Sequence, residues 1–407
     1  MPLRLVLATL LGLSSLCAAA RGAEGPYDLH EWGVFKVSRN DAWAQRDMKE
    51  EWASFPKFFY RMWPERHLPW RGAVDKPVIF FHAEKAVKLQ FTVTFATGKP
   101  LVWWPAASSP GEAGGLEPVG QPNRIVWYVD LQAQGQGFKA SHEVPEGHWV
   151  QKLRAVAASA IQTYGDASNR RGGDQQEESF VYYDGIFQAP AGPKVARGAN
   201  ALVFETNSDH AWLDVLVIDR REKETFVGKA WTAKIEAGKQ STKVELVSAG
   251  DAKGEKETIE RLRRELTDRL SAAGLNKDEA ESLVKVWDEG FFARPGLTLL
   301  YRVPQETYEK WLPLTANPAP KKCVRVGLVL HTSLEPELEA TVETQIKKLA
   351  DEKFEVRDAA RKLLAQIGGA AFPQLEKHFS DPDVETAKTC RAIVEGLDTK
   401  PALNAKK

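Results

Sequence analysis

Four residues of this chain are candidates for metal chemistry, because imidazole and carboxylate groups bind zinc and similar ions in proteins. They are His30, Glu31, His82 and His210. His30 and Glu31 are neighbours, so in a strand their side chains point to opposite faces and cannot both reach one ion. The simpler prediction is that His30 or Glu31 makes local hydrogen bonds while Trp32 packs in the core.

No complete catalytic motif accompanies these residues. His142-Glu143 and His148 are similar to a metalloprotease helix, but that motif needs its histidines four residues apart on one helical face. Here they are six apart, with Pro145 and Gly147 between them. The sequence also contains no glycine-rich phosphate loop between a strand and a helix, and no serine in a nucleophile elbow. We therefore predict no catalytic residue and no cofactor.

Tryptophan is frequent, with 13 in 407 residues. Exposed indoles can stack on sugars or anchor a partner. The candidates for such an aromatic platform are Trp63, Trp70, Trp103 and Trp104. In a large β-rich core most tryptophans are buried instead, so a carbohydrate-binding module is an alternative rather than the leading hypothesis.

Short strand-like runs position these candidates. Residues 27–35 read as a first strand, Pro77 to Phe81 is apolar, and Val87 to Phe95 alternates between apolar and polar residues. Further runs follow at 101–104, 124–131, 180–183, 200–205, 211–218, 226–235, 297–303 and 323–331. Such strands, separated by turns with Gly and Pro, predict a mainly β, antiparallel, sandwich-like domain over 24–335.

Two regions change to helical spacing. In 253–292 large apolar residues recur three or four positions apart, and Asn276 followed by Glu279 forms a capping box that starts a second helix. We predict a helical hairpin there, inserted into the β domain. Residues 337–397 are helical throughout and predict stacked antiparallel helices, followed by a polar tail at 398–407.

The first residues are typical of a secretory signal. Arg4 supplies a positive start, Leu5 to Leu16 is an apolar run shorter than a membrane span, and an alanine triplet offers a cleavage site. We predict a signal peptide over 1–20 and an exported protein, periplasmic or extracellular, with no transmembrane helix after signal removal. Cys17 does not favour a lipid anchor, because bulky Leu16 stands where a small residue is needed.

Charge and cysteine content exclude several classes of protein. The 55 Lys and Arg residues balance 55 Asp and Glu residues, which argues against a nucleic-acid binder or a binder of anionic membranes. Only Cys323 and Cys390 follow the signal, so there is no disulfide framework. Both cysteines lie in apolar runs and are predicted to be buried thiols.

The C-terminal helices carry one resemblance. From Leu349 to Ala360 an acidic turn precedes Val356-Arg357 and an alanine, and this run looks like a HEAT-type repeat. A second, weaker unit begins at Asp381, with Glu385 where an arginine would stand. The resemblance implies a helical surface for protein contacts.

The preceding residues carry another resemblance, in scattered blocks over most of 27–335. The blocks are His30-Glu31-Trp32-Gly33, Lys76 to Phe81, Phe180 to Tyr183, and Ala280 to Pro320. They resemble an uncharacterised family of exported bacterial proteins, of the kind common in planctomycetes. This resemblance implies export, and it brings no activity and no catalytic residues.

Taken together, the sequence favours a non-catalytic extracytoplasmic binding or scaffolding protein that uses the helices of 337–397 to contact a protein partner. One alternative is a metal-dependent hydrolase of an envelope polymer with His30, Glu31, His82 or His210 as ligands. The other is a module that binds a glycan through its tryptophans.

Overall fold

The structure is a computed structural model that describes most of the chain. The described residues are 24–37, 55–61, 72–107, 123–164, 175–188, 192–198, 200–221, 224–294, 296–331, 334, 336–367 and 371–399. The predicted signal peptide lies outside these residues. Among them, no helix combines the length and the apolar composition needed to cross a bilayer.

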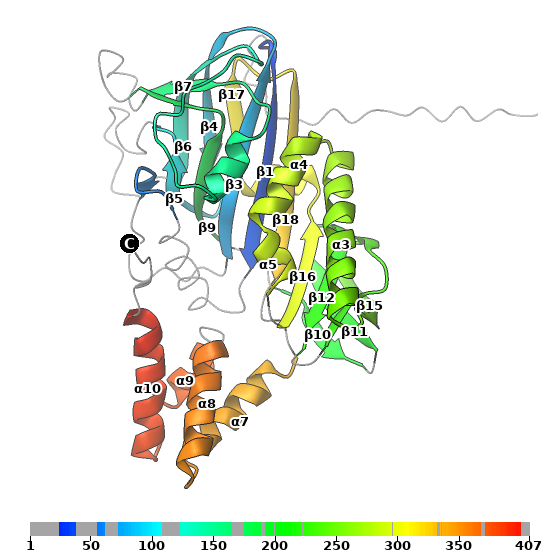
Figure 1. Ribbon diagram of the computed structural model, residues 1–407, viewed down its shortest axis with the longest axis vertical. Coiled ribbons are helices and arrows are strands. Elements are labelled where there is room, and N and C mark those ends of the chain that lie inside the picture. The colour runs from blue at the N-terminus through cyan, green and yellow to red at the C-terminus, as the bar shows by residue number, and fades with distance from the viewer. Residues whose placement is uncertain are drawn as a thin grey trace, which may run out of the picture.

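Thirteen strands form one large sheet (Figure 1). Inside it, β1 (Tyr27–Val37) pairs with β18 (Lys322–His331) on one side and with β3 (Gly72–Ala83) on the other. On the β18 side follow β16 (Gly296–Arg302), β12 (Trp212–Arg220), β13 (Thr225–Gly228), β15 (Gly238–Ser248), β11 (Ala201–Ser208) and β10 (Lys194–Arg197), with β14 (Thr232–Ile235) paired to β12. On the β3 side follow β9 (Val181–Phe187), β5 (Gly98–Trp104) and β2 (Tyr60–Arg61).

The pairing of β1 with β18 is parallel, whereas the other named strand pairs of both sheets are antiparallel. The predicted antiparallel character is therefore confirmed for the sheets as a whole, with this one pair as the exception. Antiparallel neighbours can be joined by a tight turn, but parallel neighbours need a long connection. Here the connection is nearly the whole domain, since Glu31 and Arg325 are partners in the register although they lie 294 residues apart in the sequence.

A second sheet of five strands shares a hydrophobic core with the large sheet. Phe81 of the large sheet and Phe91 of the small one have ring centroids 5.6 Å apart. Along the small sheet, Phe91 is buried and its neighbour Gln90 is exposed, which confirms the alternation predicted for this run. The strands are β17 (Leu314–Asn317), β4 (Val87–Thr94), β6 (Arg124–Leu131), β7 (Ile161–Tyr164) and β8 (Gln176–Glu178).

Helices pack on the opposite face of the large sheet and form a second core with it. They are α2 (Trp149–Arg154), α3 (Ala252–Ala272), α4 (Lys277–Val286) and α5 (Asp288–Phe292). The predicted hairpin is present, but its second arm breaks at Trp287 into two helices. The short helix α6 (Gln305–Trp311), which packs against the other core through Tyr308, was not predicted.

Four further helices follow the sheets and group at one end of the molecule (Figure 1). They have a hydrophobic core of their own, built around buried residues such as Val342, Leu364 and Cys390. Cys390 is thus buried as predicted, whereas Cys323 in β18 is partly exposed. The helices are α7 (Leu338–Lys348), α8 (Phe354–Ile367), α9 (Phe372–Lys377) and α10 (Val384–Thr399).

Candidate functional site

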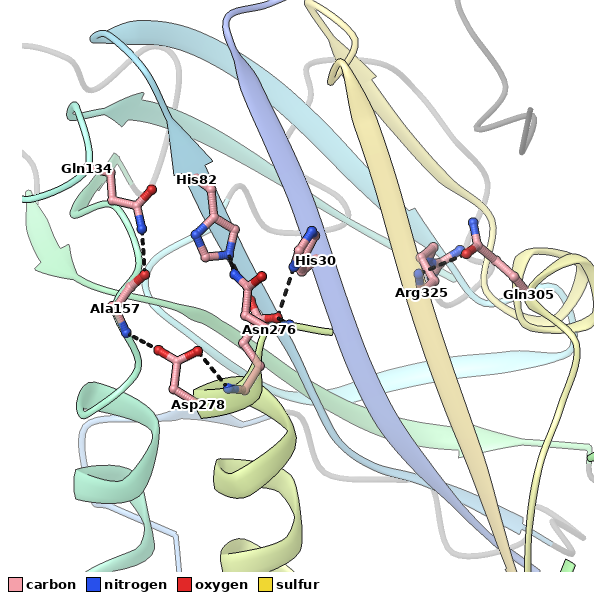
Figure 2. A network of polar contacts seen from close by, with 9 residues as sticks. His30, His82, Gln134, Ala157, Asn276, Asp278, Gln305 and Arg325 are labelled. Carbon is pink, nitrogen blue, oxygen red and sulfur yellow. Dashed lines mark hydrogen bonds and ion pairs between the residues drawn. The ribbon is translucent and has the colours of Figure 1, made fainter. Parts of the chain in front are cut away.

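The first strand presents His30 and Glu31 to opposite sides of the large sheet, as the alternation of a strand predicts. Trp32, on the same side as His30, belongs to the core under the helices, and it is fully buried as the sequence predicts. Figure 2 shows His30 and His82 on neighbouring strands, both directed toward Asn276 at the start of α4. Glu31 instead contacts residues of the core between the two sheets.

On the helix side, His30 and His82 converge on the carboxylate of Glu279. His30 Nδ1 lies 2.9 Å from Glu279 Oε2, and His82 Nε2 lies 2.7 Å from Glu279 Oε1. The side chains of His30 and His82 are 5% and 10% exposed and that of Glu279 is fully buried. One ligand atom from each of the three residues lies within 4.8 Å of the others, so the two candidate histidines form a compact cluster with a carboxylate that was not predicted.

The start of α4 fixes the position of Glu279. The backbone N–H of Asn276 donates to Glu279 Oε2 at 2.7 Å, which is one half of the predicted capping box. Asp278 joins the same turn to the chain before β7, because its Oδ2 accepts from the backbone N–H of Ala157 at 2.7 Å (Figure 2). The helix end is thereby held against the large sheet, with its carboxylate directed at the two imidazoles.

The electrostatics of Glu279 favour its ionised form. Burial alone raises the pKa of a carboxyl group, but the hydrogen bonds from His30 and His82 outweigh burial and lower the pKa of Glu279 to about 2. A charged carboxylate that faces two imidazole nitrogens is a donor set for a divalent metal ion. Chemically, this cluster can bind a cation or act as a buried ionic clamp.

On the opposite face, Glu31 forms a buried ionic network. Its Oε2 accepts from Arg325 Nε at 2.5 Å, and its Oε1 accepts from the hydroxyl groups of Tyr308, at 3.0 Å, and Tyr183. The side chains of Glu31 and Arg325 are fully buried. Burial opposes the charge of Arg325, yet the Glu31 carboxylate keeps its pKa well above the ordinary value. With its carboxylate satisfied by three partners, Glu31 is structural and lies away from the histidine cluster.

The fourth metal candidate, His210, lies in the turn between β11 and β12. Its Nδ1 contacts Asp209 Oδ1 at 2.7 Å, and its ring packs edge-on against Trp311 with centroids 5.1 Å apart. Only one carboxylate faces it among the described residues, and Asp209 is largely exposed. The structure therefore does not bring His210 together with His30 and His82.

The proposed aromatic platform is wrong for two of its four members. Trp103 is 5% exposed and Trp104 is fully buried, and both lie in β5 inside hydrophobic cores. Such side chains cannot stack on a sugar from solvent. Trp63 and Trp70 lie outside the described residues.

Sequence reasoning missed the two charged residues that complete these sites, Glu279 and Arg325. Glu279 was identified only as a capping residue, and its second role depends on histidines 249 and 197 residues away. Arg325 stands in a strand that is otherwise almost entirely buried. A charged residue in such a run is the one sequence signal that could have indicated a buried counter-ion.

The C-terminal helices carry a different kind of site, an exposed apolar surface. Phe354, the first residue of α8, is 66% exposed, and Val384, the first residue of α10, is 77% exposed. Phe354 lines a hollow of about 230 Å³, as does Glu385, the residue that follows Val384. We call Phe354, Val384 and this hollow the C-terminal patch. The hollow is lined by Leu349, Phe354, Arg357, Asp358, Arg361, Glu385 and Thr389.

Comparisons with known proteins give no family. No protein-family model matches the chain, and no curated protein matches its sequence. Among solved structures, it is similar to the Fcho1 Mu homology domain of Danio rerio with a bound Eps15 peptide, with TM-score 0.28, 7% identity, and coverage of 76% of this chain and 98% of that one. It is also similar to the yeast delta-COP-I mu-homology domain complexed with a Dsl1 WxWxV peptide, with TM-score 0.25, 6% identity, and coverage of 75% and 96%. Likenesses this weak carry no functional argument.

Proposed function

We propose that this chain is an exported, non-catalytic binding protein whose C-terminal helices contact a protein partner. The observation that carries the proposal is the C-terminal patch. Among the described residues, four large hydrophobic side chains are exposed, and three of them lie on α8 and α10. They are Val247, Phe354, Leu363 and Val384. Exposed large apolar side chains on two helices in contact with each other are typical of a surface that another molecule covers.

The internal core of α7–α10 supports this function. Because these helices bury their own apolar residues against one another, the exposure of Phe354 and Val384 is not needed to build the helical unit. A stack of helix pairs that presents one surface suits the HEAT-like description. The core shared by the two sheets likewise supports a sandwich-like description of the preceding domain.

The chemistry around the hollow indicates the kind of partner. The guanidinium of Arg357 lies 5.9 Å from the ring centroid of Phe354, and Arg361, which is 58% exposed, pairs with Asp358 at 2.8 Å. An aromatic ring beside arginines favours a protein segment that inserts an apolar side chain and places a carboxylate near Arg361. The partner we propose is therefore an exported or envelope protein that presents such a segment.

The test is a binding experiment with the full mature chain and a double substitution, Phe354→Ser with Val384→Ser. The partner is captured from an envelope extract, identified by mass spectrometry, purified and titrated against each variant. We expect the double substitution to weaken Kd at least about 30-fold, the effect of losing one interface hot spot. Because both side chains are exposed, the melting temperature should change little.

Val247→Ser is the matched control, because Val247 is also an exposed apolar residue, 39% exposed, but lies on β15. It should leave Kd unchanged. Equal Kd values for the wild type and the double variant would refute the proposal, as would equal losses in the double variant and the Val247→Ser control.

A further inference from the structure

We propose that His30, His82 and Glu279 bind one divalent transition-metal ion, zinc in the first place, which fastens α4 to β1 and β3. The proposal is independent of the C-terminal patch and goes beyond the binding function. It rests on the convergence of two imidazoles and one carboxylate from three separate elements, with one ligand atom of each within 4.8 Å of the others.

The geometry of the cluster is close to that of a zinc site. With bonds of about 2.0–2.1 Å, tetrahedral zinc holds its nitrogen and oxygen ligands about 3.3 Å apart. Here the carboxylate oxygens of Glu279 lie 2.9 Å and 2.7 Å from the nearest nitrogens of His30 and His82. Insertion of an ion therefore lengthens these two contacts by a few tenths of an ångström, and the three ligand atoms, which lie within 4.8 Å of one another, must all come to about 3.3 Å apart.

Binding of an ion at this site shifts a proton within each neutral imidazole ring and releases none. Without an ion, a proton on His30 Nδ1 and one on His82 Nε2 bridge to the carboxylate. Metal ligation requires those nitrogens to be unprotonated, so in each neutral ring the proton moves to the other nitrogen. For His30 that nitrogen is Nε2, which is buried and has no hydrogen-bond partner among the described residues. The proton shift therefore breaks no hydrogen bond at His30 Nε2, and it replaces a buried unpaired acceptor by a buried unpaired donor.

The surroundings orient the carboxylate and place an amide group beside His82. The backbone N–H of Asn276 holds Glu279 Oε2 at 2.7 Å, which fixes the direction of the carboxylate. The side-chain nitrogen of Asn276 lies 3.3 Å from His82 Nε2 (Figure 2). Rotation of this exposed amide by about half a turn exchanges its nitrogen and oxygen, so the oxygen becomes a candidate fourth ligand in place of its capping contact with the backbone of Glu279.

The donor set and its burial decide which ion binds and what it does. Two imidazoles, a carboxylate and no thiolate suit zinc and exclude soft ions such as Cu(I). Side-chain exposures of 5%, 10% and 0% leave little room for a polymer substrate. We therefore assign the ion a structural role, in which it ties the helical hairpin to the sheet.

Zinc titration of the purified mature chain tests the proposal. After treatment with a chelator, the wild type should bind one equivalent of zinc and gain melting temperature as free zinc increases, because the assembled ligands exist only in the folded state. His82→Ala and Glu279→Gln should each weaken zinc binding more than about 100-fold, since changes outside the ligand set already cost 10–100-fold.

His148→Asn is the matched control. His148 is an imidazole at the N-cap of α2, and asparagine is an equally good N-cap residue, so this variant should bind zinc as the wild type does. Cobalt titration of the wild type gives a readout that needs no substitution, because four-coordinate Co²⁺ develops intense visible bands. A folded wild-type protein that binds no zinc would overturn the proposal. Zinc binding that persists unchanged in His82→Ala would overturn it as well, since the ion would then lie elsewhere.

Discussion

The ion pair between Glu31 and Arg325 allows a quantitative test of how the centre of the fold is stabilised. Both side chains are fully buried, and Arg325 Nη1 and Nη2 have no hydrogen-bond partner among the described residues. Glu31→Gln would leave the arginine charge without its counter-ion. Breaking a buried pair on one side costs about 3–5 kcal/mol, so this variant should lose that much of the free energy of unfolding. Arg325→Met should lose a similar amount for the converse reason.

The double variant distinguishes a true ion pair from two independent core residues. With both charges gone, neither residue is left uncompensated, and the amide oxygen introduced by Glu31→Gln can still accept from the two tyrosine hydroxyls at this position. Independent losses would add to about 6–10 kcal/mol. We expect instead a loss no larger than that of either single variant, which is a coupling energy of at least about 3 kcal/mol.

Urea denaturation at about pH 7 measures these differences, provided that the slope against urea stays constant across the four proteins. Losses in the double variant that equal the sum of the single losses would refute the reasoning. So would a Glu31→Gln variant as stable as the wild type, because the charge of Arg325 would then be compensated by something other than Glu31.

Three further predictions concern other core positions. In Gly33→Ala the new Cβ would lie 2.7 Å from Tyr308 Oη, so we expect a loss of about 1–3 kcal/mol from overpacking, and unchanged stability in urea would contradict this. Trp104→Ala should cost about 3–5 kcal/mol, because the side chain is fully buried; a change in glycan-array binding at unchanged stability would argue against a core role. Burial lowers the pKa of His331 from 6.5 to about 3, so between these pH values the unfolded chain binds more protons and stability falls on acidification. Between these pH values the free energy of unfolding falls by at most about 5 kcal/mol. The urea midpoint of His331→Phe should therefore change less between about pH 7 and about pH 5 than that of the wild type.

The local features of the fold were predictable because they depend on short-range patterns. Strand alternation correctly placed His30 and Glu31 on opposite faces, and the Asn276–Glu279 spacing correctly located the start of α4. Helical periodicity also gave the hairpin and the C-terminal helices. Each of these predictions needs only neighbours within a few residues along the chain.

The partners in the two buried clusters were not predictable for the same reason. Nothing near Glu279 in the sequence indicates that His30 and His82 face it, and nothing near Glu31 indicates Arg325. Tertiary packing alone creates these contacts. Trp104 shows a different failure of sequence reasoning. Its residue type made it a candidate binding residue, but the structure shows that it is buried among other aromatic rings.

The parallel pairing of β1 with β18 has a consequence for the order of folding. β1 is an interior strand of the large sheet, yet one of its two neighbours ends only at His331. Until that neighbour arrives, β1 has an open edge of backbone donors and acceptors, which is a template for pairing with other chains. Contacts this distant in sequence also slow folding. A chain shortened before β18 should therefore aggregate rather than form a smaller stable domain. In the full chain, the edge of β1 stays open to pairing with other chains until β18 has formed.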